Sequence, residues 1–184
     1  RNAPDAKDNR NGAVGNVTFD NLRCLEISGI KAADREERVL TSYRELPGGI
    51  IYLDRLDFEN TFTITNVSDD DNSTTYDVIF ANNTSDRGTI YADYVTLSGN
   101  GGINFSANTA LKDRGGAISA TKEVSITNNT GEVLFKSNET NNDGAAIYSE
   151  GTVLLEGNEG SLVFHENKGG SIIYAKNDIV FRGN

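Results

Sequence analysis

The 184-residue sequence has few of the side chains on which catalytic and stabilising sites usually depend. Cys24 is the only cysteine, so no internal disulfide can form, and an extracellular chain of this kind would rely on regular hydrogen bonding for stability. Cys24 lies in the apolar run 22–27 and is predicted to be a small buried side chain. His165 is the only histidine, so Ser–His or Cys–His catalysis would have to use it. We therefore expect no catalytic residues, no metal site and no cofactor.

Basic residues are outnumbered, with 17 Lys and Arg against 27 Asp and Glu, and the net charge is -10. This balance argues against a nucleic-acid partner and against docking on an anionic membrane. Solubility alone would also explain the acidity. No apolar run approaches the roughly 18 residues of a transmembrane helix, so we expect no membrane insertion of this segment. No signal peptide is recognisable, and we expect a mature or excised piece of a longer protein.

Hydrophobic residues make up 36% of the chain, a share low enough to suggest disorder. They fall, however, in short regular clusters, which indicates an ordered domain with many polar turns. A Gly-containing segment followed by isoleucine recurs about every 25–30 residues after a longer first interval. The segments are GGIIY at 48–52, GTIY at 88–91, GGAIS at 115–119, GAAIY at 144–148 and GGSIIY at 169–174.

Two further apolar clusters that end in asparagine follow each Gly-containing segment except the last, which is followed by one. The second clusters are FTITN at 62–66, VTLSGN at 95–100, VSITNN at 124–129, VLLEGN at 153–158 and IVFRGN at 179–184. The third clusters are VIFANN at 78–83, INFSAN at 103–108, VLFKSN at 133–138 and LVFHEN at 162–167, and each contains Phe-x-x-Asn. Three short strands per repeat cannot bury an apolar face alone, but stacked coils can.

The repeats predict an all-β fold, a right-handed parallel β-helix with three short strands per coil and three sheets. Each strand would pair with its counterpart one coil away, about 4.8 Å along the axis. The phenylalanines and isoleucines would stack inside, and the asparagines would form two hydrogen-bonded ladders at the turns. One predicted ladder is Asn66, Asn100, Asn129, Asn158 and Asn184, and the other is Asn83, Asn108, Asn138 and Asn167. An α/β alternative is disfavoured because no helical pattern separates the strands.

The first 47 residues are less regular and are predicted to form an N-terminal cap or irregular first coil. Residues 17–19 and 25–27 resemble strands, and residues 31–43 have helical potential. The β-helix repeats are predicted at 48–86, 87–114, 115–143, 144–168 and, incomplete, 169–184. Because no cap is visible after the last cluster, we expect further repeats in the natural protein. Open coil ends would also allow a homo-oligomer to form head to tail.

Alternating GGAI-like and Phe-x-x-Asn tetrapeptides on an acidic, Asn-rich chain resemble the polymorphic membrane protein family of Chlamydia-like autotransporters. The resemblance covers roughly residues 48–184. FANN, FSAN, FKSN and FHEN match one motif well, whereas only GGAI at 115–118 matches the other perfectly. The resemblance implies an exported passenger, displayed at the bacterial outer membrane or secreted, and associated with adhesion to host cells.

Two groups of residues are candidates for binding. Asp69, Asp70 and Asp71 lie with Tyr76 in the insertion 66–77, where adjacent carboxylates could bind Ca²⁺. Their spacing matches no known calcium loop, which favours a solvated acidic loop. The other group follows the repeat isoleucines, and period-2 alternation predicts that it faces outward as an aromatic stripe. Its members are Tyr52, Tyr91, Tyr148 and Tyr174, with Ser119 interrupting. Such a stripe could bind proteins or sugars, or could only stabilise the sheet.

The favoured function is that of a bacterial surface adhesin fragment that binds a host cell-surface protein or glycan through the β-helix face and the inserted loop. One alternative is a structural spacer that holds a distal binding domain away from the membrane. The other is a carbohydrate-active β-helix enzyme, which would group carboxylates, Lys and Arg on one face of the central coils. The sequence favours a protein that is not an enzyme.

Overall fold

The computed structural model describes residues 16–30, 50–53, 59–68 and 76–184, and every element in these ranges is a β-strand. The predicted helical segment 31–43 lies outside the described residues. The strands before the first long one are β1 (Val17–Asp20), β2 (Leu25–Ser28), β3 (Ile51–Tyr52), β4 (Thr61–Thr65), β5 (Val78–Ala81) and β6 (Thr84–Ser85). Next come β7 (Ile90–Ser98), β8 (Ile103–Ser106), β9 (Thr109–Ala110), β10 (Ile118–Thr127), β11 (Val133–Lys136) and β12 (Glu139–Thr140). The last are β13 (Ile147–Ser149), β14 (Thr152–Glu156), β15 (Leu162–His165), β16 (Ile173–Ala175) and β17 (Ile179–Arg182).

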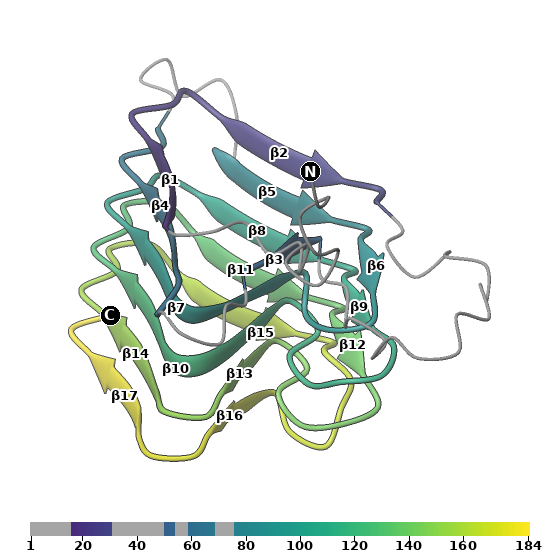
Figure 1. Cartoon of the computed structure of the whole chain (residues 1–184). Coiled ribbons are helices and arrows are strands. Elements are labelled where there is room, and N and C mark those ends of the chain that lie inside the picture. The colour runs from purple at the N-terminus through teal and green to yellow at the C-terminus, as the bar shows by residue number, and fades with distance from the viewer. Residues whose placement is uncertain (1–15, 31–49, 54–58, 69–75) are drawn as a thin grey trace, which may run out of the picture.

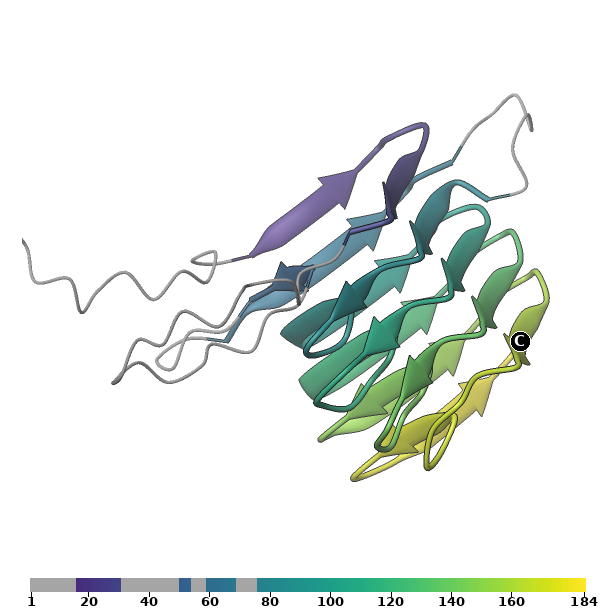
Figure 2. The ribbon, with the colours of Figure 1, turned by 90° about the vertical axis from the view of Figure 1, so that its right-hand side faces the viewer.

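The strands stack in parallel as the coils of a β-helix, which confirms the predicted fold class (Figures 1 and 2). A nine-stranded sheet runs in the order β1-β4-β7-β10-β13-β16, with β3, β14 and β17 attached to it. A five-stranded sheet has the order β15-β11-β8-β5-β2, and a three-stranded sheet has the order β12-β9-β6. Strands far apart in sequence therefore lie one above another, each displaced by one coil.

The sheets do not correspond one to one with the three sequence clusters. The Gly-containing and second clusters share the nine-stranded sheet, and in two coils they merge into the long strands β7 and β10. Residues 92–94, between the clusters of β7, contain no Gly, Pro or Asn to turn the chain, and a register irregularity between Ala120 and Glu123 absorbs the longer linker of β10. The third sheet consists of the residue pairs that directly follow the asparagines of the Phe-x-x-Asn motifs.

The core is a column of inward-facing phenylalanines flanked by branched aliphatic side chains. Rings of consecutive coils stack with centroids 4.9, 5.1 and 5.1 Å apart, from Phe80 through Phe105 and Phe135 to Phe164. Their registers pair Phe with Phe across three interfaces. In the central coils the inward isoleucines of the nine-stranded sheet, Ile90, Ile118 and Ile147, are fully buried. Each coil buries this apolar face only because another coil covers it, which explains why the repeats fold together.

The asparagine ladder of the Phe-x-x-Asn motifs is confirmed. The side-chain amide of Asn83 donates to the Oδ1 atom of Asn108 at 3.0 Å, and Asn108 donates in turn to Asn138 at 2.9 Å. The amide of Asn138 also donates to the carbonyl of Phe105 in the preceding coil. Buried amides that are satisfied in this way stabilise the corner, because an unpaired buried polar group costs about 1–3 kcal/mol.

The other ladder begins at Asn100 and not, as predicted, at Asn66. Asn100, Asn129, Asn158 and Asn184 are linked by bonds of 3.0, 2.8 and 2.8 Å. Asn66 instead has φ of 53° and is exposed, and buried Val67 takes the ladder position, its N–H donating to Oδ1 of Asn100 at 3.0 Å. The sequence cluster FTITN lacks the extra residue that VTLSGN has before its asparagine, so Asn66 falls on the left-handed position of Gly99.

The irregular N-terminal region contributes two strands in register with the rest. β1 pairs with β4 and β2 with β5, at the two segments for which the sequence suggested strands. Cys24, predicted to be buried, is exposed, because it lies in the turn between these strands and not in either of them. The described residues form no helix that is long and apolar enough to cross a membrane.

Candidate functional site: an Arg–Tyr corner on the nine-stranded sheet

The tyrosines that follow the repeat isoleucines occupy one register position on the outside of the nine-stranded sheet. Tyr91 pairs with Ser119, Ser119 with Tyr148, and Tyr148 with Tyr174. The rings of Tyr148 and Tyr174 stack with centroids 5.0 Å apart and planes 10° apart. Tyr52 pairs with Tyr91 through the backbone of β3, but its side chain lies outside the described part of the chain.

The tyrosine stripe is less open than the alternation predicted, since Tyr148 is only 6% exposed. Two arginines that the sequence interpretation missed cover part of it. The guanidinium carbon of Arg87 lies 4.6 Å from the ring centroid of Tyr91, and that of Arg114 lies 5.0 Å from that of Tyr148. Both are cation–π contacts, and they join the loops before β7 and β10 to the sheet. We call these four residues the Arg–Tyr corner.

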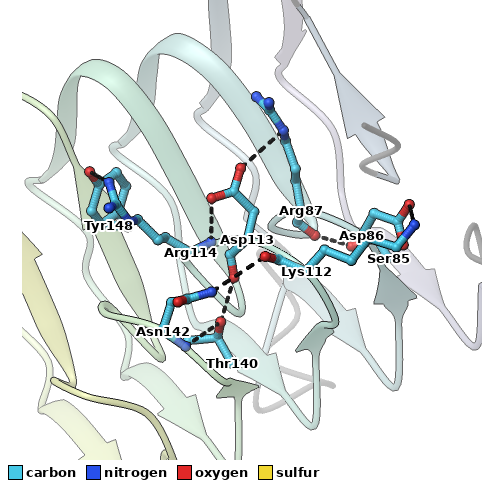
Figure 3. A network of polar contacts seen from close by, with 9 residues as sticks. All are labelled: Ser85, Asp86, Arg87, Lys112, Asp113, Arg114, Thr140, Asn142 and Tyr148. Carbon is cyan, nitrogen blue, oxygen red and sulfur yellow. Dashed lines mark hydrogen bonds and ion pairs between the residues drawn. The ribbon is translucent and has the colours of Figure 1, made fainter. Parts of the chain in front are cut away.

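Asp113 and Asp86 hold the loops of the Arg–Tyr corner together (Figure 3). One carboxylate oxygen of Asp113 binds Nε of Arg87 at 3.1 Å, and the other accepts the backbone N–H of Arg114 at 2.9 Å. Asp86 pairs with Lys112 at 3.1 Å. The Lys112 and Asp113 N–H groups both donate to the Asp86 carbonyl at 3.0 Å, so successive loops stack as the strands do.

A sequence signal for the arginines exists in the repeated tripeptide Asp-Arg-Gly. It occurs at 86–88 and again at 113–115, each time just before a repeat isoleucine. Its glycines stand where a side chain would not fit: Gly115 has φ of 73°, and a Cβ on it would lie 2.3 Å from the carbonyl oxygen of Ile118. The tight turn at this glycine brings the preceding arginine back over the sheet.

Electrostatics tie Arg114 to Tyr148 more closely than the ring contact alone. Nη1 of Arg114 donates a hydrogen bond to the Tyr148 hydroxyl, and this bond raises the pKa of the guanidinium above its ordinary value. Burial raises the pKa of Tyr148, and the bond from Arg114 partly opposes that rise. Both groups therefore keep their usual neutral-pH states, a cation beside a neutral phenol.

A hollow of about 180 Å³ opens at the corner above Ser119, the position where the tyrosine stripe is interrupted. We call it the Ser119 hollow. Its lining comprises the Arg–Tyr corner itself together with Asp113, Ser119, Ala120, Thr121 and Glu150. Donors, acceptors and aromatic rings thus line one small space, an arrangement suited to binding and lacking a nucleophile–histidine pair, since His165 lies in β15 on another sheet.

The inserted loop is a separate feature. Asp69, Asp70 and Asp71 lie outside the described residues, so the predicted acidic contact stays a prediction. Tyr76 precedes β5 and is not part of the tyrosine stripe; its hydroxyl hydrogen-bonds to a carboxylate oxygen of Glu132. Burial and this carboxylate raise the pKa of Tyr76 to about 12. Within the described ranges, no group of three or more His, Cys, Asp or Glu side chains is placed to hold a metal ion.

Comparison with known proteins finds sequence similarity to outer membrane proteins of Chlamydia. The chain is 43% identical over 86 residues to the probable outer membrane protein pmp6 of Chlamydia pneumoniae, a match covering 46% of this chain and 7% of that protein. It is 30% identical over 129 residues to the probable outer membrane protein pmp21 of the same organism, covering 65% of this chain and 8% of that protein. The chain is thus similar, over these segments, to outer membrane proteins of the polymorphic membrane protein (Pmp) family. The probable outer membrane protein PmpF of Chlamydia trachomatis is another Pmp relative, 37% identical over 95 residues, with 45% of this chain and 9% of that protein covered.

The chain thus spans less than a tenth of the length of these Pmp relatives. No family model matches the sequence. No solved structure matches it. The relatives are named as outer membrane proteins and not as enzymes, and their matches to this chain support the predicted resemblance.

Proposed function

We propose that this chain is part of a surface-displayed Pmp passenger and that it binds host cells through the Arg–Tyr corner. A location at the bacterial outer membrane is supported by the names of its relatives. The observation that carries the binding proposal is the corner itself, which presents two arginines, the partly exposed Tyr91 and a hollow on the outside of a rigid sheet. Arginine and tyrosine are the residue types most enriched at the energetic centres of interfaces.

Rigid β-helix coils suit this role because the corner is fixed by backbone pairing on both sides. β10 pairs with β7 on one side and with β13 and β14 on the other. A partner that contacts the corner would therefore find its side chains already placed, which lowers the entropy lost on binding. The partner would be a host cell-surface protein or glycan, and the loop 66–77 stays a second predicted contact.

The test is binding of the labelled, monomeric 184-residue fragment to cultured epithelial cells. We expect saturable binding that unlabelled fragment competes. A variant carrying Arg87→Gln and Arg114→Gln should lose at least about thirtyfold in affinity, because a central interface arginine contributes about 2 kcal/mol or more. Arg182→Gln is the matched control, since Arg182 pairs with Glu156 on the same sheet, away from the corner. Equal binding by all three proteins would refute the assignment of the corner.

The spacer function remains the second candidate, and the uniform register of the coils favours it. Val95, Val124 and Val153 follow one another in register, as do the phenylalanines of the neighbouring sheet. In that case the fragment would not bind cells above an unrelated acidic β-helix, while a longer passenger would. The enzyme alternative required charged groups on one face, and the corner does group them. However, Asp86 and Asp113 are both engaged in ion pairs that hold the loops together, and we therefore rank the enzyme alternative last.

A further inference from the structure

We propose that the Ser119 hollow binds one acidic sugar residue of a glycan, a pyranose ring that carries a carboxylate. The proposal rests on the proposed function for its biological setting and names the chemical class of the ligand. It depends on three properties of the hollow: a missing ring, an arginine without an acidic partner, and carboxylates at its edge.

The tyrosine stripe lacks one aromatic ring because serine occupies the tyrosine position in the coil of β10. Ser119 stands between Tyr91 and Tyr148 in the stack, so those two tyrosines are separated by two coil spacings, about 9.6 Å. Where two tyrosines occupy adjacent coils, Tyr148 and Tyr174, their rings stack at 5.0 Å. The serine therefore leaves room comparable to one ring, part of which the two guanidinium groups fill. Ser119 itself is 4% exposed and forms the floor.

The arginine without an acidic partner is Arg114. Lys112 is ion-paired with Asp86 and Arg87 with Asp113, whereas no carboxylate of the described residues lies within ion-pair distance of the Arg114 guanidinium. Asp113 and Glu150 attract that guanidinium only from farther away. Arg114 is exposed, and among the described residues its guanidinium donates a hydrogen bond to the neutral hydroxyl of Tyr148. Its remaining N–H groups match the two oxygens of a carboxylate, the geometry that arginine binds best.

Carboxylates at the edge of the hollow distinguish a sugar from a simple anion. Asp113 and Glu150 both line it, and they would repel a sulfate ion, which has no hydrogen-bond donor to offset the repulsion. Sugar hydroxyls can donate to these carboxylates while the sugar's own carboxylate binds Arg114. Ser119 and Thr121 add hydroxyl groups, and Tyr91 and Tyr148 complete the lining. An acidic sugar satisfies each of these groups at once.

The experiment measures binding of three oligosaccharides to the full 184-residue chain by titration calorimetry and by chemical shift changes. The probes are a hyaluronan hexasaccharide, an α2,8-linked sialic acid trimer and a heparin hexasaccharide, each also in carboxyl-reduced form. We expect at least one carboxylated probe to bind. Its carboxyl-reduced form should bind at least about tenfold more weakly. Absence of binding by all three probes would overturn the proposal, as would equal binding by the reduced forms.

Two variants test the location. Ser119→Tyr supplies the residue that the adjacent coils already carry at this position, so it should fold normally and fill the hollow. Arg114→Gln removes the charge and keeps the length of the side chain. Each should weaken sugar binding about tenfold or more, whereas Ser125→Tyr, an equivalent substitution elsewhere on the outer face of β10, should not. Sugar binding that survives Ser119→Tyr, in a protein whose thermal unfolding is intact, would place the site elsewhere.

Cell binding separates this proposal from the proposed function. Cell binding without any sugar binding would leave the adhesive role standing and refute the Ser119 hollow as a sugar site. Sugar binding without cell binding would support the hollow and refute the adhesive role of the fragment.

Discussion

The middle of the stack and its last coil carry the same motifs in very different surroundings. Phe105 and Phe135, in the middle, are fully buried between coils on both sides. In the last coil, β16 and β17, Phe181 is 58% exposed, although its register partner Leu155 in the preceding coil is fully buried. Ile179 is likewise 44% exposed at the position where Val153 is buried. A residue at the same inward-facing position is therefore buried only when a further coil packs over it.

This contrast shows that burial in the β-helix depends on neighbours more than on the motif. Each interface between coils adds a column of stacked side chains and one rung of an asparagine ladder. Stability is therefore approximately a sum of nearest-neighbour terms, and a change in the middle breaks two interfaces where a change at the end breaks one. Three pairs of substitutions compare the middle of the stack with its end, and a seventh substitution tests a contact between coils two apart.

The largest expected effect comes from shortening the phenylalanine column. Phe105→Ala should lower the free energy of unfolding by about 3–5 kcal/mol, because it removes a fully buried ring and leaves a cavity between two others. Phe181→Ala should cost less than about 1 kcal/mol, since most of that ring is already in water. Denaturant unfolding followed by circular dichroism measures both. Similar losses for the two variants would contradict the nearest-neighbour account.

The asparagine ladder gives the next effect. Asn129→Ala should cost about 2–3 kcal/mol, because it leaves the buried N–H group of Asn100 and the carbonyl of Leu97 without their partner. Asn184 is exposed at the end of the same ladder, so Asn184→Ala should cost about 1 kcal/mol or less. Thermal unfolding of the two variants in the same buffer gives the ratio of their losses in unfolding free energy. If Asn184→Ala lowered stability as much as Asn129→Ala, the hydrogen bonds of the ladder would not contribute independently from coil to coil.

Backbone strain should, in contrast, be independent of position. The residue before each Phe-x-x-Asn asparagine has positive φ, 51° at Ala107 in the middle and 55° at Glu166 near the end. Glycine tolerates this conformation, so Ala107→Gly and Glu166→Gly should each raise stability by up to about 1 kcal/mol. Chemical unfolding of both variants shows whether the unfolding free energy rises or falls. A loss of stability in either would show that the side chain contributes more than the strain costs.

The smallest effect is pH-dependent and involves Tyr76, which links coils two apart through Glu132. Burial and the neighbouring carboxylate raise its pKa from 10.0 to about 12, so the folded state favours the protonated phenol. That contribution is complete below pH 10 and is lost as the pH rises through about 12. Tyr76→Phe should remove this part of the alkaline loss of stability, measured by thermal unfolding at pH 9 and pH 11.5. Unchanged alkaline behaviour in the variant would show that Tyr76 is not responsible.

Much of the fold follows from the sequence because its repeats place equal residues in equal surroundings. The Phe-x-x-Asn motif predicted an inward ring and a ladder amide, and the structure has three consecutive ring contacts along that column. Asn66 was wrongly placed because a one-residue difference in cluster length changes its position in the turn. The merging of two clusters into β7 and β10 was missed because clusters mark apolar residues and not chain direction.

The candidate site was predicted less completely. Alternation predicted which face the tyrosines occupy, but it carries no information on which loop residues fold back over them. Arg87 and Arg114 reach Tyr91 and Tyr148 through glycine turns, whose geometry becomes visible only in three dimensions. The repeated Asp-Arg-Gly tripeptide was the available signal.

Amide hydrogen exchange, followed residue by residue by NMR, tests the stacked-coil account most directly. The account predicts the slowest exchange in β8 and β11, which are paired on both sides, and exchange faster by orders of magnitude in β17, which lies at the end of the stack. Uniform exchange across all strands, or protection in β17 equal to that in β8, would contradict it.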